Sequence, residues 1–257
     1  MALNKNQLRS MLRLDGFERS THYDLEWMLA NEMGPNAIWL AEFLSQGMSL
    51  QPGMRVLDMG CGTAMTSIFL AKEFGVQVWA NDLWISATDN FRRIMEAGVD
   101  NLVYPIHAEA HALPYAEGFF DAVISVDSYH YYGTDDAYLP CFARLLKPGG
   151  QIGIVVPGLL AELDGEVPAY LKPFWEPDFW TFHSVAWWRR HWQQTNLVEI
   201  EIADNLPEGW AIWKKWEDVM RAAEANKPGR EGDLELLTAD NGRNLCFVRL
   251  VARKLKT

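Results

Sequence analysis

Short apolar segments alternate with helical segments along most of the chain, and this alternation restricts the fold more than any other feature. Strands that alternate with helices form parallel sheets with helices on both faces. The sequence therefore predicts an α/β fold with a doubly wound, mostly parallel seven-stranded sheet. The seven segments with the length and composition of strands are 55–59, 76–82, 101–108, 119–127, 151–158, 197–203 and 244–254.

Residues 1–50 differ from the rest, because they contain helical segments and no strand. We therefore expect an N-terminal helical part, 1–50, followed by one Rossmann-like domain, 51–257. Ligands of such sheets bind beyond the carboxyl ends of the strands. The long segments after the fifth and sixth strands, near 158–182 and 204–232, are therefore expected to be helical insertions on the substrate side.

Charge and cysteine content exclude several functional classes. The formal net charge of the 257 residues is -11, which argues against binding of nucleic acid or of an anionic membrane surface. The three cysteines stand far apart and form no Cys/His cluster, so neither a metal site nor a disulfide framework is expected. No segment resembles a secretory signal or a membrane span. We expect a cytoplasmic protein without stable membrane insertion.

The stretch VLDMGCGTA, residues 56–64, places an acid and two glycines directly after a predicted strand. A glycine-rich turn at this point allows the backbone to approach a ligand and directs the next helix N-terminus at it. The dinucleotide fingerprint G-x-G-x-x-G would need a third glycine at the position of Met65. The pattern is instead D-x-G-x-G-x-A, which disfavours a nicotinamide-dependent oxidoreductase.

This pattern resembles motif I of the class I S-adenosylmethionine (SAM)-dependent methyltransferases, acid-x-G-x-G-x-G, with Ala64 in place of the last glycine. Later landmarks follow in the family's order: Asp82 ends the second strand, and HAEAHALPY, FFDAVISVDSYHYYG and LLKPGG come after it. The resemblance is strong from about the glycine motif to the fifth strand. It implies the family's fold, SAM as the cofactor and S-adenosylhomocysteine (SAH) as the product.

The resemblance also implies which residues bind the amino-acid end of SAM. The turn of Gly60, Cys61 and Gly62 would accommodate this end, and Asp58 beneath the turn would help to hold its ammonium group. Many relatives close the cofactor site with N-terminal helices, so residues 1–50 are expected to form a lid. A tyrosine of such a lid often reaches the carboxylate of SAM, and here Tyr23 is the candidate.

For the nucleoside of SAM, the resemblance implies a second set of contacts. Asp82 would accept hydrogen bonds from both ribose hydroxyls, and Leu83 would pack on the adenine. Glu109, where the family usually has aspartate, would accept from the adenine amino group, and the backbone N–H of Ala110 would bind the ring. We also expect Asp127, at the end of the fourth strand, to contact the cofactor.

The loop DSYHYYG after the fourth strand is the densest cluster of polar and aromatic residues. His130 is its only histidine, and a pKa near ~6.5 suits a general base; the alternative is a structural histidine. Tyr129 and Tyr131 are candidates for the acceptor pocket, or for a packed loop. From the two insertions, Trp175 and Trp210 would add an aromatic wall, unless these tryptophans belong to the core.

Together these features predict an enzyme that transfers a methyl group from SAM to a small molecule by in-line displacement. Its type resembles the bacterial small-molecule methyltransferases, and an aromatic-walled pocket favours an amine or an aromatic acceptor. The alternatives are a SAM-binding protein that does not methylate and, with less support, a nicotinamide-dependent oxidoreductase. No nucleic-acid partner is expected, and a monomer and a homodimer are both compatible with the sequence.

Overall fold

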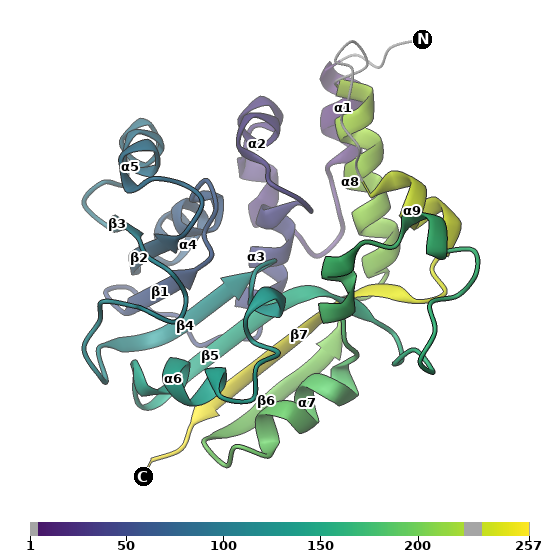
Figure 1. Cartoon of the computed structure of the whole chain (residues 1–257). Helices are drawn as coiled ribbons and strands as arrows, with labels where there is room; N and C mark the ends of the chain where they lie inside the picture. Colours follow the sequence, from purple (N-terminus) through teal and green to yellow (C-terminus); the bar gives the residue numbers. More distant parts are fainter. Residues whose placement is uncertain (1–4, 224–232, 257) are drawn as a thin grey trace.

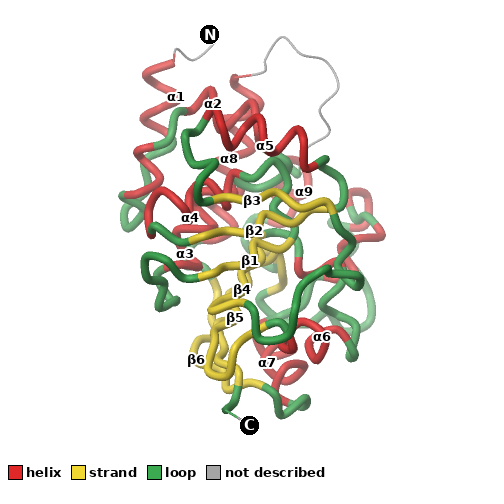
Figure 2. The backbone as a smooth tube through the Cα atoms, turned by 90° about the vertical axis from the view of Figure 1, so that its left-hand side faces the viewer, coloured by secondary structure: helices red, strands yellow, loops and turns green. Residues whose placement is uncertain are grey.

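A seven-stranded sheet forms the centre of the computed structural model, which describes residues 5–223 and 233–256 (Figures 1 and 2). The strand order is β3-β2-β1-β4-β5-β7-β6, and every pair is parallel except those of β7, which is antiparallel to β5 and β6. The predicted doubly wound, mostly parallel sheet is therefore confirmed. The strands are β1 (Arg55–Met59), β2 (Gln77–Asp82), β3 (Val103–His107), β4 (Phe120–Val126), β5 (Leu146–Leu159), β6 (Val198–Asn205) and β7 (Leu245–Lys254).

Helices cover both faces of the sheet. Side chains alternate along each strand, so Ile124 joins the core on one face and Val123 the core on the other. The first core also receives side chains from α1 (Lys5–Met11), α2 (Leu25–Asn31), α3 (Ala37–Ser45), α4 (Met65–Phe74), α5 (Ala87–Glu96), α8 (Gly209–Ala223) and α9 (Leu234–Asp240). The second receives them from α6 (Tyr138–Arg144) and α7 (Val185–Gln193).

Four short 3₁₀ helices complete the described regular structure: η1 (Arg19–His22), η2 (Tyr129–Tyr131), η3 (Lys172–Phe174) and η4 (Pro177–Thr181). The last two belong to the predicted insertion 158–182. Most of the other insertion, 204–232, is α8, and its residues 224–232 lie outside the described part. Within the described ranges, no helix is long and apolar enough to cross a membrane.

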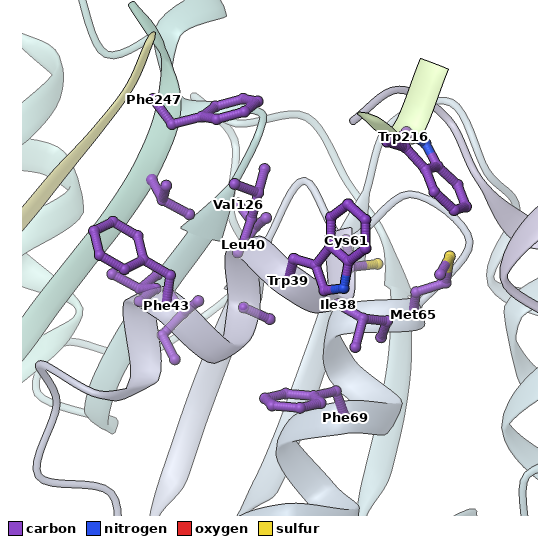
Figure 3. Packing of buried hydrophobic residues seen from close by; sticks show 14 of the residues in the cluster. Ile38, Trp39, Leu40, Phe43, Cys61, Met65, Phe69, Val126, Trp216 and Phe247 are labelled. Atoms are coloured by element: carbon purple, nitrogen blue, oxygen red, sulfur yellow. The ribbon is translucent and has the colours of Figure 1, made fainter. Parts of the chain in front are cut away.

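The N-terminal helices, within residues 5–50, pack directly on the sheet domain. Figure 3 shows Trp39 of α3 among the buried side chains, with Trp216 of α8 close to it. Their ring centroids lie 6.0 Å apart with planes at 74°. The indole N–H of Trp216 also donates to the backbone carbonyl of Gly34 at 3.0 Å. These contacts fix the segment between α2 and α3 above the ends of the strands.

The side chain of Asp58 lies beneath the junction of β1 and α4 and links the strand to the first turn of the helix. It is 0 % exposed, and its Oδ2 accepts hydrogen bonds from the hydroxyls of Thr66 and Ser67 in the first turn of α4. Its Oδ1 has no partner among the described residues. Burial raises the pKa of Asp58 to about 6, because an ionised carboxylate loses its hydration there. The ionised form therefore destabilises the fold.

We predict a pH-dependent effect of Asp58→Asn on stability. The unfolded pKa is about 3.9 and the folded pKa about 6, so the wild-type chain loses stability as pH rises between them. The asparagine variant has no such loss. The free energy of unfolding of the variant, relative to wild type, should rise by about 1.5 kcal/mol from pH 5 to pH 7.5. Urea unfolding at both pH values measures this, and a difference independent of pH would contradict it.

Candidate functional site

A cavity of about 330 Å³ opens at the carboxyl ends of β1, β2 and β4. The strand order reverses between β1 and β4, and this is where open α/β sheets bind their ligands. The volume lies within the range typical of small-molecule sites. Its lining residues come from five segments: 31–37, 59–66, 82–84, 109–111 and 126–132.

The glycine turn forms the floor of this cavity. Gly60 has a φ of 73°, and a Cβ there would lie 1.9 Å from Ser128 Oγ, so only glycine fits between β1 and the loop after β4. The N–H groups of Gly60 and Cys61 donate to the carbonyl of Asn81, at 2.9 and 3.0 Å. The turn is therefore held against the ends of two neighbouring strands, and Gly60, Cys61 and Gly62 all face the cavity.

Asp82 binds this turn through its carboxylate. Oδ2 accepts from the N–H of Gly62 at 2.8 Å, while Oδ1 accepts from Trp84 and Ile85 at 2.7 and 2.9 Å. The side chain is buried yet lines the cavity. Leu83 also lines the cavity and is half exposed. Asp82 and Leu83, both predicted from the sequence as cofactor-site residues, therefore line the same cavity as the glycine turn.

Glu109 and Ala110 form the wall beyond the end of β3. The carboxylate of Glu109 accepts from the N–H of His111 at 2.8 Å, and Nδ1 of His111 lies 2.8 Å from its other oxygen. The hydrogen bond from the His111 side chain holds the pKa of Glu109 below its usual value. Glu109 is thus an ionised, partly exposed acceptor at the position where the resemblance expects contact with an adenine.

Residues 31–37 close the cavity from the N-terminal side. The hydroxyl of Thr63 donates to the carbonyl of Asn31, and Arg93 Nε of α5 donates to the Asn31 side chain at 3.1 Å. A Cβ on Gly62 would lie 2.9 Å from the sulfur of Met33. The strap between α2 and α3 therefore packs directly on the glycine turn.

The structure does not place Tyr23 at the cavity. Its hydroxyl donates to Glu73 at 3.2 Å, and its ring packs against Trp27 and Phe69 with centroids 5.7 Å away in each case. The tyrosine thus links the N-terminal segment to the C-terminal end of α4. The expected contact with the carboxylate of SAM is not made from this position.

The structure places His130, the candidate general base, in a packed position outside the cavity. Only 1 % of it is exposed, it is not among the cavity-lining residues, and its Nδ1 has no partner within the described ranges. Its ring packs against Tyr131 at 4.0 Å and Phe182 at 5.6 Å. Burial lowers the pKa of His130 to about 3. Such a group is a weak base, because the interior penalises its protonated form.

The aromatic candidates separate into one cavity residue and three core or surface residues. Tyr131 lines the cavity, whereas Tyr129 is fully buried against α6 and α7. Trp210 donates its indole N–H to the carbonyl of Leu237, and Trp175 packs against Phe179 in the insertion. Neither tryptophan lines the cavity, so the predicted aromatic wall is not built from the insertions.

Asp58 and Asp127 lie at different depths. Asp58 is beneath the floor and is not among the residues that line the cavity. Asp127 lines it, at the end of β4, with a φ of 53°. Burial, with the charge of Asp233, raises the pKa of Asp127 well above its usual value.

Trp84 also lines the cavity, and it was not among the residues predicted from the sequence. Its position directly after Asp82 and Leu83 was the available signal.

Among the described residues, no group of three or more His, Cys, Asp or Glu side chains is arranged to hold a metal ion. The polar side chains that line the cavity are instead hydroxyls, an amide, an imidazole and separate carboxylates. Such donors and acceptors suit an organic ligand with several hydrogen-bonding groups.

Comparison with known proteins assigns the domain. Residues 56–150 match the family described as "Methyltransferase domain". A sarcosine/dimethylglycine N-methyltransferase of Halorhodospira halochloris is 34% identical over 103 residues, which are 40% of this chain and 37% of that protein. The matched part spans half or less of the first curated relatives.

Solved structures share the fold over most of this chain at low sequence identity. Phosphoethanolamine N-methyltransferase 2 of Haemonchus contortus superimposes with a TM-score of 0.72 and 19% identity, over 96% of this chain and 60% of that one. The [4+2]-cyclase SpnF gives 0.68 and 17%, over 88% and 84%. The identification from the glycine motif is confirmed: residues 56–150 form a methyltransferase domain of the class I SAM-dependent family.

Proposed function

We propose that this protein transfers a methyl group from SAM to a small-molecule acceptor. The observation that carries the proposal is the convergence of the motif residues on one cavity: the glycine turn, Asp82, Leu83, Glu109 and Ala110 all line it. These residues come from three strand ends that are far apart in sequence. Their meeting at the switch point is what a nucleoside-containing cofactor requires.

The residues present fit SAM. The backbone of Gly60–Gly62 suits the amino-acid end, because Cys61 is the only one of these three residues with a side chain. Asp82 suits the ribose, since three backbone N–H groups orient its carboxylate before any ligand arrives. Glu109 and Ala110 suit the adenine, and Leu83 presents an exposed apolar surface to the ring. Asp58 does not line the cavity, so it would act on the ammonium group of SAM only through its electrostatic field from beneath the turn.

When bound, SAM supplies a methyl group on a sulfonium leaving group. The residues of the chain then have to align the acceptor and exclude water, which is the larger part of catalysis for a displacement of this kind. We assign the exclusion of water to the strap 31–37, as the lid of the site, because it already packs on the glycine turn. No general base is assigned to His130.

An amine or an aromatic acceptor fits this site best. Tyr131 and Trp84 bring two partly exposed rings to the cavity, and such rings bind planar or cationic groups. Two proteins similar to this chain are named as N-methyltransferases, one of sarcosine and dimethylglycine and one of phosphoethanolamine. Others are named as O-methyltransferases, including one of fatty acids, so the names alone do not choose the acceptor atom.

A SAM-binding protein that does not methylate is the second candidate. It is favoured by one specific observation, since a structure that shares this fold is named a [4+2]-cyclase. The two candidates differ in a measurable way. A methyltransferase consumes SAM in the presence of its acceptor, whereas a protein that only binds SAM leaves it unchanged.

We predict that the purified protein releases SAH from SAM when it is given a pool of primary and secondary amines. Pools of phenols, carboxylates and thiols serve as comparisons, and the protein without acceptor is the blank. Release above the blank from one pool names the acceptor class. No release from any pool, with SAM bound, would contradict methyl transfer to these classes and support the second candidate.

We predict that Asp82→Ala lowers the affinity for SAM by at least about 100-fold, since two hydrogen bonds to a charged acceptor are lost. Isothermal titration calorimetry measures this. Asp89→Ala is the matched control, because it removes the same charge from the exposed start of α5. An affinity of Asp82→Ala close to that of the control, in a variant that stays folded, would remove Asp82 from the cofactor site.

A further inference from the structure

One wall of the cavity holds a carboxylate that has no role in the assignments above. This wall is formed by the end of β4 and the loop after it, and Asp127 is its only carboxylate among the described residues. The N–H of Asp127 donates to the carbonyl of Val155 at 2.8 Å, which fixes the backbone. A Cβ on Gly34 would lie 2.8 Å from Asp127 Oδ2, so the strap 31–37 covers the carboxylate from the other side.

This carboxylate is half-buried, and within residues 5–223 and 233–256 it has no hydrogen bond and no cationic partner. A carboxylate taken out of water without a donor is unfavourable, unless a ligand supplies the donor or the charge. Asp82 and Glu109 differ from it, since both already accept bonds from backbone N–H groups. Asp127 is therefore the cavity carboxylate whose partner has to come from a ligand.

The electrostatic field at this wall is negative. After burial, the groups that raise the pKa of Tyr131 to about 12 are the carboxylates of Asp127, Asp178, Asp233 and Glu176. Deprotonation of Tyr131 would place a further negative charge among them. The same field that opposes an anion at this ring stabilises a cation beside it.

Two exposed rings flank the same wall. Trp84 is 71 % exposed and Tyr131 is 49 % exposed, although both are large apolar side chains. They come from the ends of β2 and β4, and their centroids lie 6.1 Å apart. His130 packs behind Tyr131 and stays neutral, because burial lowers its pKa to about 3. It therefore adds no positive charge that would weaken binding of a cation.

The remaining lining excludes other acceptor classes. Among the described residues that line the cavity there is no lysine and no arginine, whereas three carboxylates are present: Asp82, Glu109 and Asp127. An acceptor with only negative charge, such as a free carboxylate or a phosphate ester, would approach these acidic side chains without a lysine or an arginine of the described lining to neutralise it. An uncharged acceptor would leave the Asp127 carboxylate without a partner.

We propose that the acceptor is a cationic amine, and that its ammonium group binds between the Asp127 carboxylate and the rings of Trp84 and Tyr131. Before methylation at this nitrogen, the ammonium gives its proton to the Asp127 carboxylate. The lone pair then forms the new N–CH3 bond as the S–CH3 bond of SAM breaks and SAH leaves. A carboxylate and an aromatic pair are the groups that recognise alkylated ammonium ions. The proposal rests on the proposed function, because it names the acceptor class of the same cavity. It assigns Asp127 to the acceptor, not to the cofactor as the sequence suggested.

Two probes of equal shape test the charge requirement. Choline carries a quaternary ammonium, and 3,3-dimethylbutan-1-ol is its uncharged carbon isostere. Both are titrated by calorimetry into protein saturated with SAH. Choline should bind at least about tenfold more tightly than the alcohol. Asp127→Asn should remove most of this difference while the affinity for SAH stays unchanged. The amide suits the positive φ at this position, so the variant is expected to fold.

Two further variants separate the effect of the ammonium site from the effect of the net charge of the protein. Trp84→Leu should weaken choline by about three- to tenfold and leave the binding of the alcohol within about twofold. Glu117→Gln removes one negative charge from an exposed site near Arg144 and should change neither probe. If Glu117→Gln weakened choline as much as Asp127→Asn, the preference would come from net charge and the proposal would be wrong.

The outcomes distinguish this proposal from the one on which it rests. Failure to bind SAH would overturn the proposed function, and the acceptor class with it. Normal binding of SAH with equal affinity for the two probes, or with no binding of choline, would overturn the cationic acceptor alone. Loss of SAH affinity in Asp127→Asn, with the preference for choline intact, would return Asp127 to the cofactor site.

Discussion

Three backbone N–H groups converge on the carboxylate of Asp82, and the shape of the cavity depends on this interaction. It joins the glycine turn after β1 to the turn after β2, so the floor and one wall of the cavity are held by a single side chain. The oxygens are oriented before a ligand arrives, which reduces the entropy lost on binding. The same bonds set the backbone at Leu83 and Trp84, whose side chains point away from the core and remain exposed.

The two aspartates at the ends of β1 and β4 show how position decides what a carboxylate does. Asp58 is sealed beneath the floor, where two hydroxyls partly compensate its burial, and it acts on the junction of strand and helix. Asp127 lies at the cavity without a donor among the described residues, where its side chain is open to a ligand. Both carboxyl pKa values are raised by burial, yet only the second is placed to use its charge on a ligand.

Much of the fold and of the cofactor wall could be predicted from the sequence, because both depend on local patterns. Alternation of strands and helices specifies the sheet, and residues at the ends of parallel strands meet at one edge. Gly60, Asp82 and Glu109 could therefore be placed at that edge by their positions after predicted strands, while the roles expected of them came from the resemblance to the methyltransferase family. Helix α9 and the full length of β5 were not predicted, since short helices and strand ends depend on tertiary contacts.

The acceptor wall could not be predicted, because it depends on rotations within one loop. The positive φ of Asp127 and the 3₁₀ turn after it direct His130 and Tyr129 inward and leave Tyr131 at the cavity. In the sequence the three residues are equivalent candidates. The position of Tyr23 could not be predicted for a related reason, since the partner of its hydroxyl, Glu73, is 50 residues away in sequence. Trp84 could have been predicted from the sequence, because it directly follows Asp82 and Leu83 at the end of β2.

A crystal structure of the protein soaked with SAH tests the central claim most directly, because it locates the cofactor without assuming an acceptor. We predict that the ribose hydroxyls lie on the Asp82 carboxylate, the adenine between Leu83 and Ala110, and the amino-acid end over the glycine turn. The thioether sulfur should face the wall that holds Asp127 and Tyr131. SAH bound elsewhere, or in this cavity with the adenine at Asp127, would contradict the account.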